Sequence, residues 1–277
     1  MRHAPFAQPE AQPKLKKALG QNFLHNAAIC QRICQLLALT PADQILEIGP
    51  GAGALTVHLE RCPHSLLVLL EKDTYWAKER QKAAQTSTCC LLQDALTFDF
   101  SRLSGQKFSI VGNLPYNIAS PLIWTIVQDV TDLKQAVFMV QKEVAERLCA
   151  KPGQKSYGTL SVWVQSFMHT NLAFTVKPGN FTPPPKVDSA VVTFSPLAER
   201  LDPGLSTPLK ALLKLCFQKR RKQLGHILRS AQLPDCSALL AKLGHTPSCR
   251  PETLPVKSFH QLAAFFAHVL TGPEGMG

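Results

Sequence analysis

The segment Asn113-Leu114-Pro115-Tyr116 could act on an amino group that is attached to an aromatic ring. The nitrogen of such a group is a poor nucleophile, because its lone pair is delocalised into the ring. The side-chain oxygen of Asn113 and the carbonyl oxygen of Leu114 could accept both amino hydrogens and so localise the lone pair. Pro115 fixes its own φ and helps to hold the loop in shape, and Tyr116 could stack on a base that has swung out of a nucleic acid.

The chemistry that this loop favours is direct, in-line displacement at the methyl carbon of a sulfonium donor. Positioning and electrostatics supply most of the rate in such a step, so neither a nucleophilic cysteine nor a metal ion is needed. The alternative is a plain turn of the kind that Asn and Pro often form between a strand and a helix. The position of the loop, beside a candidate nucleotide site, favours the first interpretation.

A glycine-rich turn upstream of this loop could hold part of a nucleotide. Gly49, Gly51 and Gly53 follow the apolar run Leu46-Glu47-Ile48. Glycine permits positive φ and lets a ligand approach the backbone closely, and the next helix would present its N–H groups to that ligand. The spacing also satisfies the loose dinucleotide-binding pattern, so the turn alone leaves a nicotinamide dehydrogenase open.

Two carboxylates further along could bind the rest of a nucleoside. Glu71 has the spacing of an acid that binds ribose hydroxyls, and Asp94 could accept a hydrogen bond from an adenine amino group. Each also has a simpler interpretation, Glu71 as a solvated strand-end carboxylate and Asp94 as a turn or cap residue. Together with Gly49 and Asn113, however, they fall at the ends of four successive predicted strands.

The elements that must position these residues alternate between strand and helix. Apolar runs predict the strands, and amphipathic or polar stretches between them predict the helices. This rhythm indicates an α/β protein with a doubly wound, mostly parallel sheet, in which ligands bind beyond the carboxyl ends of the strands. The expected strands are 44–48, 66–70, 89–92, 108–111 and 136–140, and the expected helices are 54–61, 73–85 and 121–128.

The composition and the apolar pattern of the sequence change at both ends of this alternating region. Residues 1–13 carry three prolines and predict a flexible leader. Residues 196–208 have the composition of a linker, and the pattern is helical from Leu209 onward. We therefore expect a main domain over residues 14–197 and a small helical domain over residues 198–277.

Composition restricts the partners and the compartment. The nine cysteines include no C-x-x-C pair, so we expect reduced, structural thiols in a cytosolic (cytoplasmic) protein. We find no signal peptide and no apolar run that could span a membrane, and we expect a monomer without a membrane partner. The net charge of +11 favours a polyanionic partner, with nucleic acid first.

Two groups of basic residues could contact RNA phosphates. Such contacts would make binding sensitive to salt, whereas the alternative is a solvated surface. The first group is Lys14, Lys16 and Lys17. The second lies in a stretch without acidic residues, and we expect its consecutive charges at 219–222 to spread around a helix. This group comprises Lys210, Lys214, Lys219, Arg220, Arg221, Lys222 and Arg229.

A second unusual segment begins at Phe181 and continues through Pro183-Pro184-Pro185 to Lys186. Three consecutive prolines form a stiff, extended stretch. We expect Phe181 to stack on the face of the target base opposite Tyr116. The alternative is a rigid connector with Phe181 in the core.

Together, these motifs resemble those of the small-subunit ribosomal RNA adenine dimethyltransferases, the kasugamycin-sensitivity methyltransferases. The resemblance runs from about Lys16 to the C-terminal region. The glycine-rich turn is generic, whereas the extended loop 113–120 and the triple-proline segment are highly specific. The matching segments are 19–24, 46–51, 93–95, 113–120, 141–148, 157–162 and 181–192.

The resemblance implies a Rossmann-like S-adenosylmethionine-dependent methyltransferase fold with a small C-terminal helical domain. It implies N6,N6-dimethylation of two adjacent adenines in a hairpin near the 3′ end of 16S rRNA in the small ribosomal subunit. S-adenosylmethionine would become S-adenosylhomocysteine, with no metal involved. The family's cofactor contacts transfer to Asn22, Leu24, Gly49, Glu71, Asp94 and Asn113, to which the glycine turn adds Gly51; Asn22 and Leu24 come from the family alone.

Other functions stay open. Resistance-type relatives dimethylate 23S rRNA, although the Pro183–Ser189 segment favours the small-subunit type. A non-catalytic RNA-binding assembly factor could use the same fold, although the intact Asn113, Tyr116 and Glu71 argue for catalysis. The loop after Asn113 disfavours a dehydrogenase.

Overall fold

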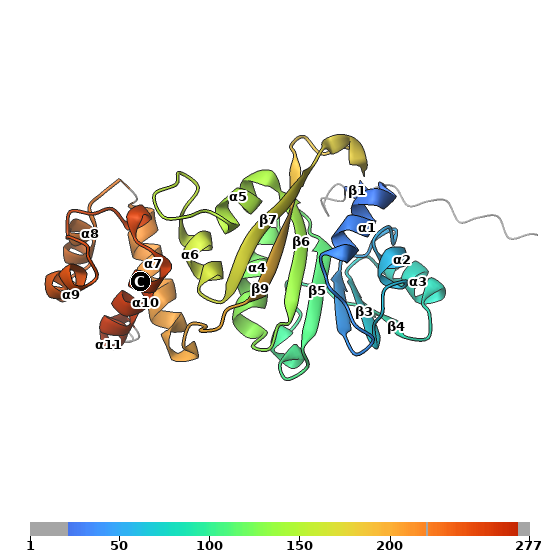
Figure 1. Cartoon of the computed structure of the whole chain (residues 1–277), viewed down its shortest axis with the longest axis horizontal. Coiled ribbons are helices and arrows are strands. Elements are labelled where there is room, and N and C mark those ends of the chain that lie inside the picture. Colours follow the sequence, from blue (N-terminus) through green and yellow to red (C-terminus); the bar gives the residue numbers. More distant parts are fainter. Residues whose placement is uncertain (1–21, 220, 271–277) are drawn as a thin grey trace, which may run out of the picture.

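A seven-stranded sheet forms the centre of the computed structural model, which describes residues 22–219 and 221–270 (Figure 1). The strand order is β4-β3-β2-β5-β6-β9-β7. Strands β4, β3, β2, β5 and β6 run parallel, and β9 and β7 are antiparallel to their neighbours. The strands are β2 (Gln44–Ile48), β3 (Leu66–Glu71), β4 (Thr88–Leu92), β5 (Phe108–Asn113), β6 (Gln135–Gln141), β7 (Met168–Val176) and β9 (Ser189–Pro196).

Helices cover both faces of this sheet, and two separate hydrophobic clusters lie beneath them. Because side chains alternate along a strand, Ile110 of β5 enters one cluster and Val111 enters the other. The first cluster packs under α4 (Ala119–Asp129), α5 (Lys142–Leu148) and α6 (Thr159–Gln165). The second packs under α1 (Ala27–Gln35) and α2 (Thr56–Leu59), and α3 (Thr74–Ala83) lies beside β4.

The structure confirms the predicted α/β alternation. The expected strand 44–48 is reproduced residue for residue, and the other four differ by one or two residues at their ends. The expected helix 54–61 is shortened to α2, because the chain before it forms a tight turn. That turn has positive φ angles of 68° at Gly49, 51° at Gly51 and 85° at Gly53, which favour glycine.

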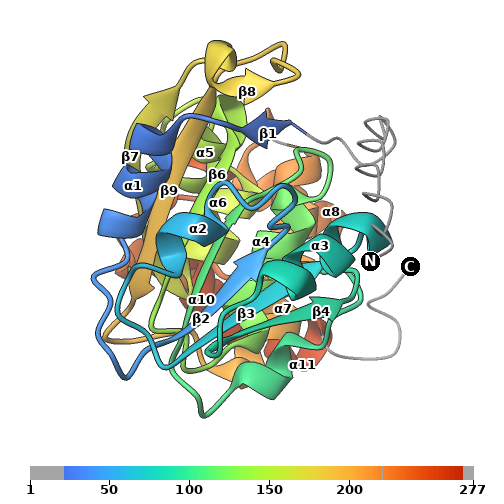
Figure 2. The ribbon, with the colours of Figure 1, turned by 90° about the vertical axis from the view of Figure 1, so that its right-hand side faces the viewer.

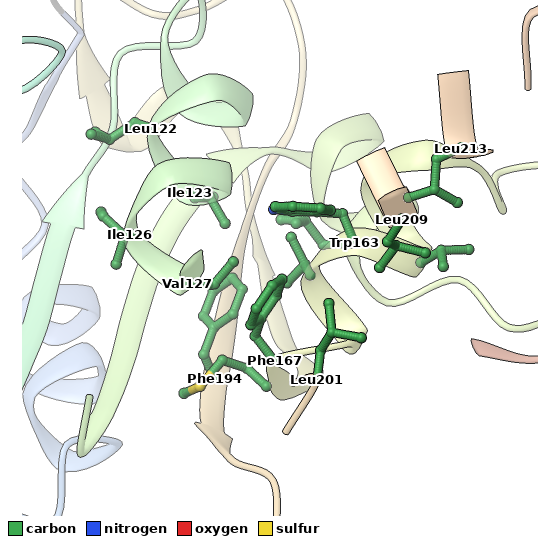
Figure 3. Close-up of a cluster of buried hydrophobic side chains, with 14 of the residues drawn as sticks. Leu122, Ile123, Ile126, Val127, Trp163, Phe167, Phe194, Leu201, Leu209 and Leu213 are labelled. Carbon is green, nitrogen blue, oxygen red and sulfur yellow. The ribbon is translucent and has the colours of Figure 1, made fainter. Parts of the chain in front are cut away.

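The C-terminal helices pack against the sheet domain on the side of α6 (Figure 1). Their core is continuous with that of the sheet domain: Trp163 and Phe167 lie close to Leu209 and Leu213 (Figure 3). The helices are α7 (Ser206–Gln218), α8 (Leu224–Ser230), α9 (Ser237–Lys242), α10 (Val256–Phe265) and α11 (Ala267–Leu270).

The interpretation of residues 196–208 as a linker needs correction. Leu201 is 4% exposed, and its N–H donates to the Ser166 carbonyl at 2.9 Å. The guanidinium of Arg200 donates to the carbonyl oxygens of Val127, Val130 and Thr131. These contacts hold the connection against the sheet domain, so the C-terminal helices are not joined to it by a flexible linker.

Some predictions fall outside the described residues. These are the leader 1–13, the basic residues Lys14, Lys16 and Lys17, and Arg220. In the described parts of the chain, no helix combines the length and apolar character that crossing a membrane requires.

Candidate active site

A cavity opens where the strand order reverses around β2. In parallel α/β sheets, such a switch point is where ligands bind, beyond the carboxyl ends of the strands. The residues predicted from four strand ends meet here. The lining includes Asn22, Gly49, Gly51, Glu71, Asp94, Asn113, Leu114, Pro115 and Tyr116.

Glu71 ties the glycine turn to the end of β3. The Gly51 N–H donates to one carboxylate oxygen of Glu71 at 2.9 Å, and the Asp73 N–H donates to the other at 2.8 Å. Burial raises the pKa of Glu71, against the opposing effect of these N–H donors. Each carboxylate oxygen keeps a further lone pair, so Glu71 can still accept a hydrogen bond from a ligand hydroxyl.

Asp94 is held at the opposite wall of the cavity. Its carboxylate pairs with the Lys72 ammonium at 2.7 Å and accepts from the Leu96 N–H at 3.0 Å. Both interactions lower the pKa of Asp94, with the Lys72 contact contributing most. Asp94 therefore offers an ionised acceptor at neutral pH.

The side chain of Asn113 has a defined orientation. Its Nδ2 donates to the backbone carbonyl of Asn22 at 3.0 Å. Because a carbonyl can only accept, the amino end of the amide must face it, which leaves Oδ1 to accept from another donor. The neighbouring Leu114 N–H donates to the Met139 carbonyl at 3.0 Å, which anchors the loop to β6.

Gly112 explains how closely this loop approaches β2. A Cβ at this position would lie 2.7 Å from the Ile48 carbonyl oxygen and 3.2 Å from Leu114 Cδ2. The first of these atoms belongs to the backbone of the neighbouring strand and cannot move aside cheaply. The close contact of β5 with β2 therefore requires glycine just before Asn113.

Tyr116 is linked to β9 through a residue that we did not single out in the sequence. Its hydroxyl lies 2.7 Å from Ser189 Oγ, and Ser189 is fully buried. Burial raises the pKa of Tyr116, so the phenol is neutral at physiological pH. The only sequence signal was that Ser189 lies within the triple-proline motif.

We expect Tyr116→Ala to lower kcat/KM by about 10- to 100-fold, the effect of losing a base-stacking ring. Tyr116→Phe keeps the ring and loses only the hydrogen bond with Ser189, so it should lower the rate a few-fold at most. Ser189→Ala removes the same bond and should match Tyr116→Phe. Steady-state kinetics with substrate RNA measures all three, and equal losses in Tyr116→Ala and Tyr116→Phe would contradict stacking.

Phe23 and Trp76 are further residues that we missed. Phe23 lines the cavity, and its ring lies so close to Gly51 that a Cβ there would be 2.7 Å from it. Trp76 supports this ring with a centroid distance of 5.4 Å. Phe23 stands between Asn22 and Leu24 in the sequence, and no local pattern marked it, because its place at the cavity depends on the pairing of β1 with β8.

Two predicted site residues do not line the cavity. β1 (Phe23–Leu24) pairs antiparallel with β8 (Phe181–Thr182) beyond the end of the sheet (Figure 2). Leu24 is 5% exposed and Phe181 is 2% exposed, and both belong to the hydrophobic cluster under α1. Packing holds both side chains in the core, so the structure favours the core alternative for Phe181 over stacking on the base. A cofactor contact at Leu24 would have to come from its backbone, and it stays a prediction.

Glu47 is buried near the end of β2, two residues before the glycine turn, and provides a pH-dependent test of the fold around the site. Burial raises its pKa to about 8, although the Thr56 hydroxyl donates to it at 2.7 Å. The ordinary pKa of a glutamate is 4.5. Between pH 4.5 and about 8, Glu47 therefore holds a proton in the folded protein that it has lost in the unfolded chain. The stability of the fold therefore falls as pH rises from 4.5 to about 8.

We expect Glu47→Gln to raise the melting temperature relative to wild type, and more strongly at pH 8 than at pH 5. Glutamine keeps an acceptor for Thr56 and cannot ionise. Thermal melts across this pH range measure the difference, with the exposed Glu199→Gln as the matched control. A constant difference between Glu47→Gln and wild type at every pH would contradict the raised pKa.

The sheet order and the residues at its switch point define a Rossmann-like methyltransferase fold. The family model described as "Ribosomal RNA adenine dimethylase" matches residues 12–268. The chain belongs to this family.

Individual relatives agree with this assignment. A protein of Nitratidesulfovibrio vulgaris (strain DP4) named Ribosomal RNA small subunit methyltransferase A is 49% identical over 251 residues, covering 89% of this chain and 94% of the relative. The protein of that name from Lawsonia intracellularis (strain PHE/MN1-00) is 46% identical, covering 91% and 93%. The crystal structure of a dimethyladenosine transferase from Plasmodium falciparum matches with a TM-score of 0.74 at 27% identity, covering 88% and 97%.

The structure of the 23S rRNA methyltransferase ErmE also matches, with a TM-score of 0.70 and 24% identity. It covers 88% of this chain and 98% of its own. At this level of identity the match shows a shared fold and does not choose between ribosomal subunits.

Proposed function

We propose that this protein transfers methyl groups from S-adenosylmethionine to N6 of two adjacent adenines in a hairpin near the 3′ end of 16S rRNA. The orientation of Asn113 carries the chemical part of this proposal. Its Nδ2 donates to the Asn22 carbonyl, so its Oδ1 is the end of the amide that can accept an N6 hydrogen. The names of the small-subunit relatives support the choice of 16S rRNA.

The residues of the cavity fit this methyl donor. Gly51 holds Glu71 through its N–H, which places an acceptor for ribose hydroxyls beside the glycine turn. Asp94 offers an acceptor for the adenine amino group at the next strand end. When bound, the donor supplies a methyl group on positively charged sulfur.

The residues of the loop act on the adenine. In the first transfer, Asn113 Oδ1 and the Leu114 carbonyl accept the two N6 hydrogens and draw the nitrogen toward tetrahedral geometry, which localises its lone pair; in the second, one of them accepts the single remaining hydrogen. In each transfer N6 gains a methyl group as the methyl–sulfur bond breaks, and N6 releases one proton to solvent. Tyr116, held by Ser189, stacks on the base and fixes its plane. The anchored loop needs little rearrangement during the reaction, which is the condition under which positioning is most effective.

The exposed basic residues of the helical region extend the site toward RNA. Lys219, Arg221 and Lys222 are all exposed, and they lie in the connection between α7 and α8. The prediction that they surround a helix is wrong: α7 ends at Gln218, and the Lys222 N–H donates to the Lys219 carbonyl in a turn. We assign binding of RNA phosphates to this turn. We also assign RNA binding to the helical domain, residues 198–277, that contains it.

Methyl transfer from labelled S-adenosylmethionine to small ribosomal subunits that lack the modification tests the proposal. We expect labelled dimethyladenosine in the digested 16S rRNA and none in large subunits treated in parallel. Asn113→Ala provides the inactive control. Label confined to large subunits would favour the 23S activity, and binding of subunits without any transfer would favour the assembly factor.

A further inference from the structure

A second cavity lies between the sheet domain and the helical region, away from the strand-end site. It is bordered by α4, the start of α6 and one face of α7, and its volume is about 380 Å³. This lies within the range of roughly 300–1,000 Å³ that is typical of small-ligand sites. The lining residues are Trp124, Thr159, Lys210, Lys214, Phe217 and Gln218.

Two aromatic rings form rigid walls of this cavity. Trp124 stacks flat on the buried Trp163, with a centroid distance of 4.1 Å and an interplanar angle of 4°. The Trp163 indole N–H also donates to the Trp124 carbonyl at 3.3 Å. One face of the Trp124 ring is thus covered, and the partly exposed remainder borders the cavity. Phe217 is held on the other side by Phe259, with a centroid distance of 5.8 Å.

The charge around the cavity is positive. Lys210 and Lys214 are exposed and stand one helical turn apart on α7, so they lie on the same face of the helix. No acidic residue occurs in the sequence between Asp202 and Asp235. Aromatic walls combined with unopposed cations suit an unpaired nucleotide, whose base stacks while its phosphates meet ammonium groups.

Helix α4 connects this cavity to the reacting loop. Helix α4 begins at Ala119, directly after the loop, and Trp124 follows five residues later. At a rise of 1.5 Å per residue, this separates them by about 8 Å along the helix axis. A nucleotide held at Trp124 would therefore lie near the RNA segment that enters the active site.

We propose that this cavity binds an unpaired nucleotide of the substrate RNA, with the base on Trp124 and the neighbouring phosphates on Lys210 and Lys214. The inference rests on the proposed function in that the substrate is RNA. A second anchoring point beside the flipped adenine would orient the strand and offset part of the cost of unpairing it.

Tryptophan fluorescence tests the stacking. A single-stranded adenine hexaribonucleotide is titrated into Trp76→Phe, which leaves only Trp124 and Trp163 as indoles. We expect quenching in this variant and almost none in Trp76→Phe/Trp124→Phe, in which phenylalanine keeps the packing. An abasic hexamer with the same phosphates should bind at least fivefold more weakly. Equal quenching in both proteins, or equal binding of both oligomers, would overturn the proposal.

Salt dependence tests the lysines. In Lys210→Gln/Lys214→Gln, the slope of log Kd against log salt for unmethylated small subunits should fall by about 1.5. The matched control is Lys78→Gln/Lys82→Gln, a pair of exposed lysines with the same spacing on α3, for which no change is expected. Equal slopes in both double variants would count against the site.

Measuring methyl transfer separately keeps this inference apart from the proposed function. At saturating subunit concentration, Lys210→Gln/Lys214→Gln should retain at least half of the wild-type turnover. If wild type binds the hexamer at Trp124 but transfers no methyl group, the proposed function fails and the cavity stands. If wild type methylates normally but the hexamer does not quench Trp124, the cavity assignment fails and the proposed function stands.

Discussion

Asn113→Ala is expected to lower kcat by about 10²- to 10³-fold, as the loss of a preorganised hydrogen-bonding group does in other enzymes. The substitution removes the oxygen that accepts an N6 hydrogen, and with it the means of localising the lone pair. It also removes the bond to the Asn22 carbonyl. That neutral hydrogen bond contributes about 1 kcal/mol to stability, so the fold should persist. Single-turnover methyl transfer measures the chemical step, and circular dichroism checks the fold.

Two further variants separate the oxygen of Asn113 from its orientation. Asn113→Asp keeps an acceptor but cannot donate to the Asn22 carbonyl, so the carboxylate should turn away from it and turnover should fall nearly as far. Asn171→Ala alters an exposed asparagine on β7, remote from the cavity, and should leave kcat unchanged. Wild-type turnover in Asn113→Ala would refute the role of the loop in holding the amino group.

The sequence predicted the sheet well because its strands carry strong, local signals. The run Gln44–Ile48 is bounded by a turn and by glycines, and its limits were obtained residue for residue. The positions of Glu71, Asp94 and Asn113 then followed from a general property of parallel sheets, whose strand ends meet at one edge. Their convergence on one cavity needed no information about long-range contacts.

The errors arose where long-range packing decided the outcome. The sequence around Phe181 does not reveal that β8 pairs with β1, and this pairing turns the ring into the core. The partners of Tyr116 and Asn113 lie on segments distant in sequence, at Ser189 and Asn22. For the same reason Leu201 was assigned to a linker, since its burial depends on contacts with α6 and the C-terminal helices.

The correction at Lys219 changes what the basic residues can do. On a helix, consecutive charges point in different directions, and only some could meet one RNA surface. In the turn after α7, the Lys222 N–H donates to the Lys219 carbonyl, and Lys219, Arg221 and Lys222 are exposed within one short connection. The turn directly follows α7, the helix that carries the exposed Lys210 and Lys214.

Neutralising this turn is expected to have the second large effect. In Lys219→Gln/Arg221→Gln/Lys222→Gln, loss of three phosphate contacts should reduce the slope of log Kd against log salt by roughly 2–3. If the variant and wild type bind equally at 1 M salt, this change in slope makes the variant bind on the order of 10²-fold more weakly than wild type at 0.1 M salt. The affinity for S-adenosylmethionine should stay within twofold of wild type, because the turn lies far from the strand ends.

Filter binding of small subunits over a range of salt concentrations measures this slope, and calorimetry measures the cofactor affinity. The matched control neutralises Lys78, Lys82 and Lys107, three exposed lysines outside the helical region, with the same change in net charge. If binding depended only on net charge, both triple variants would weaken equally, and the turn would have no special role. A loss confined to the turn variant, largest at low salt and shrinking toward 1 M salt, would instead support phosphate binding by this turn.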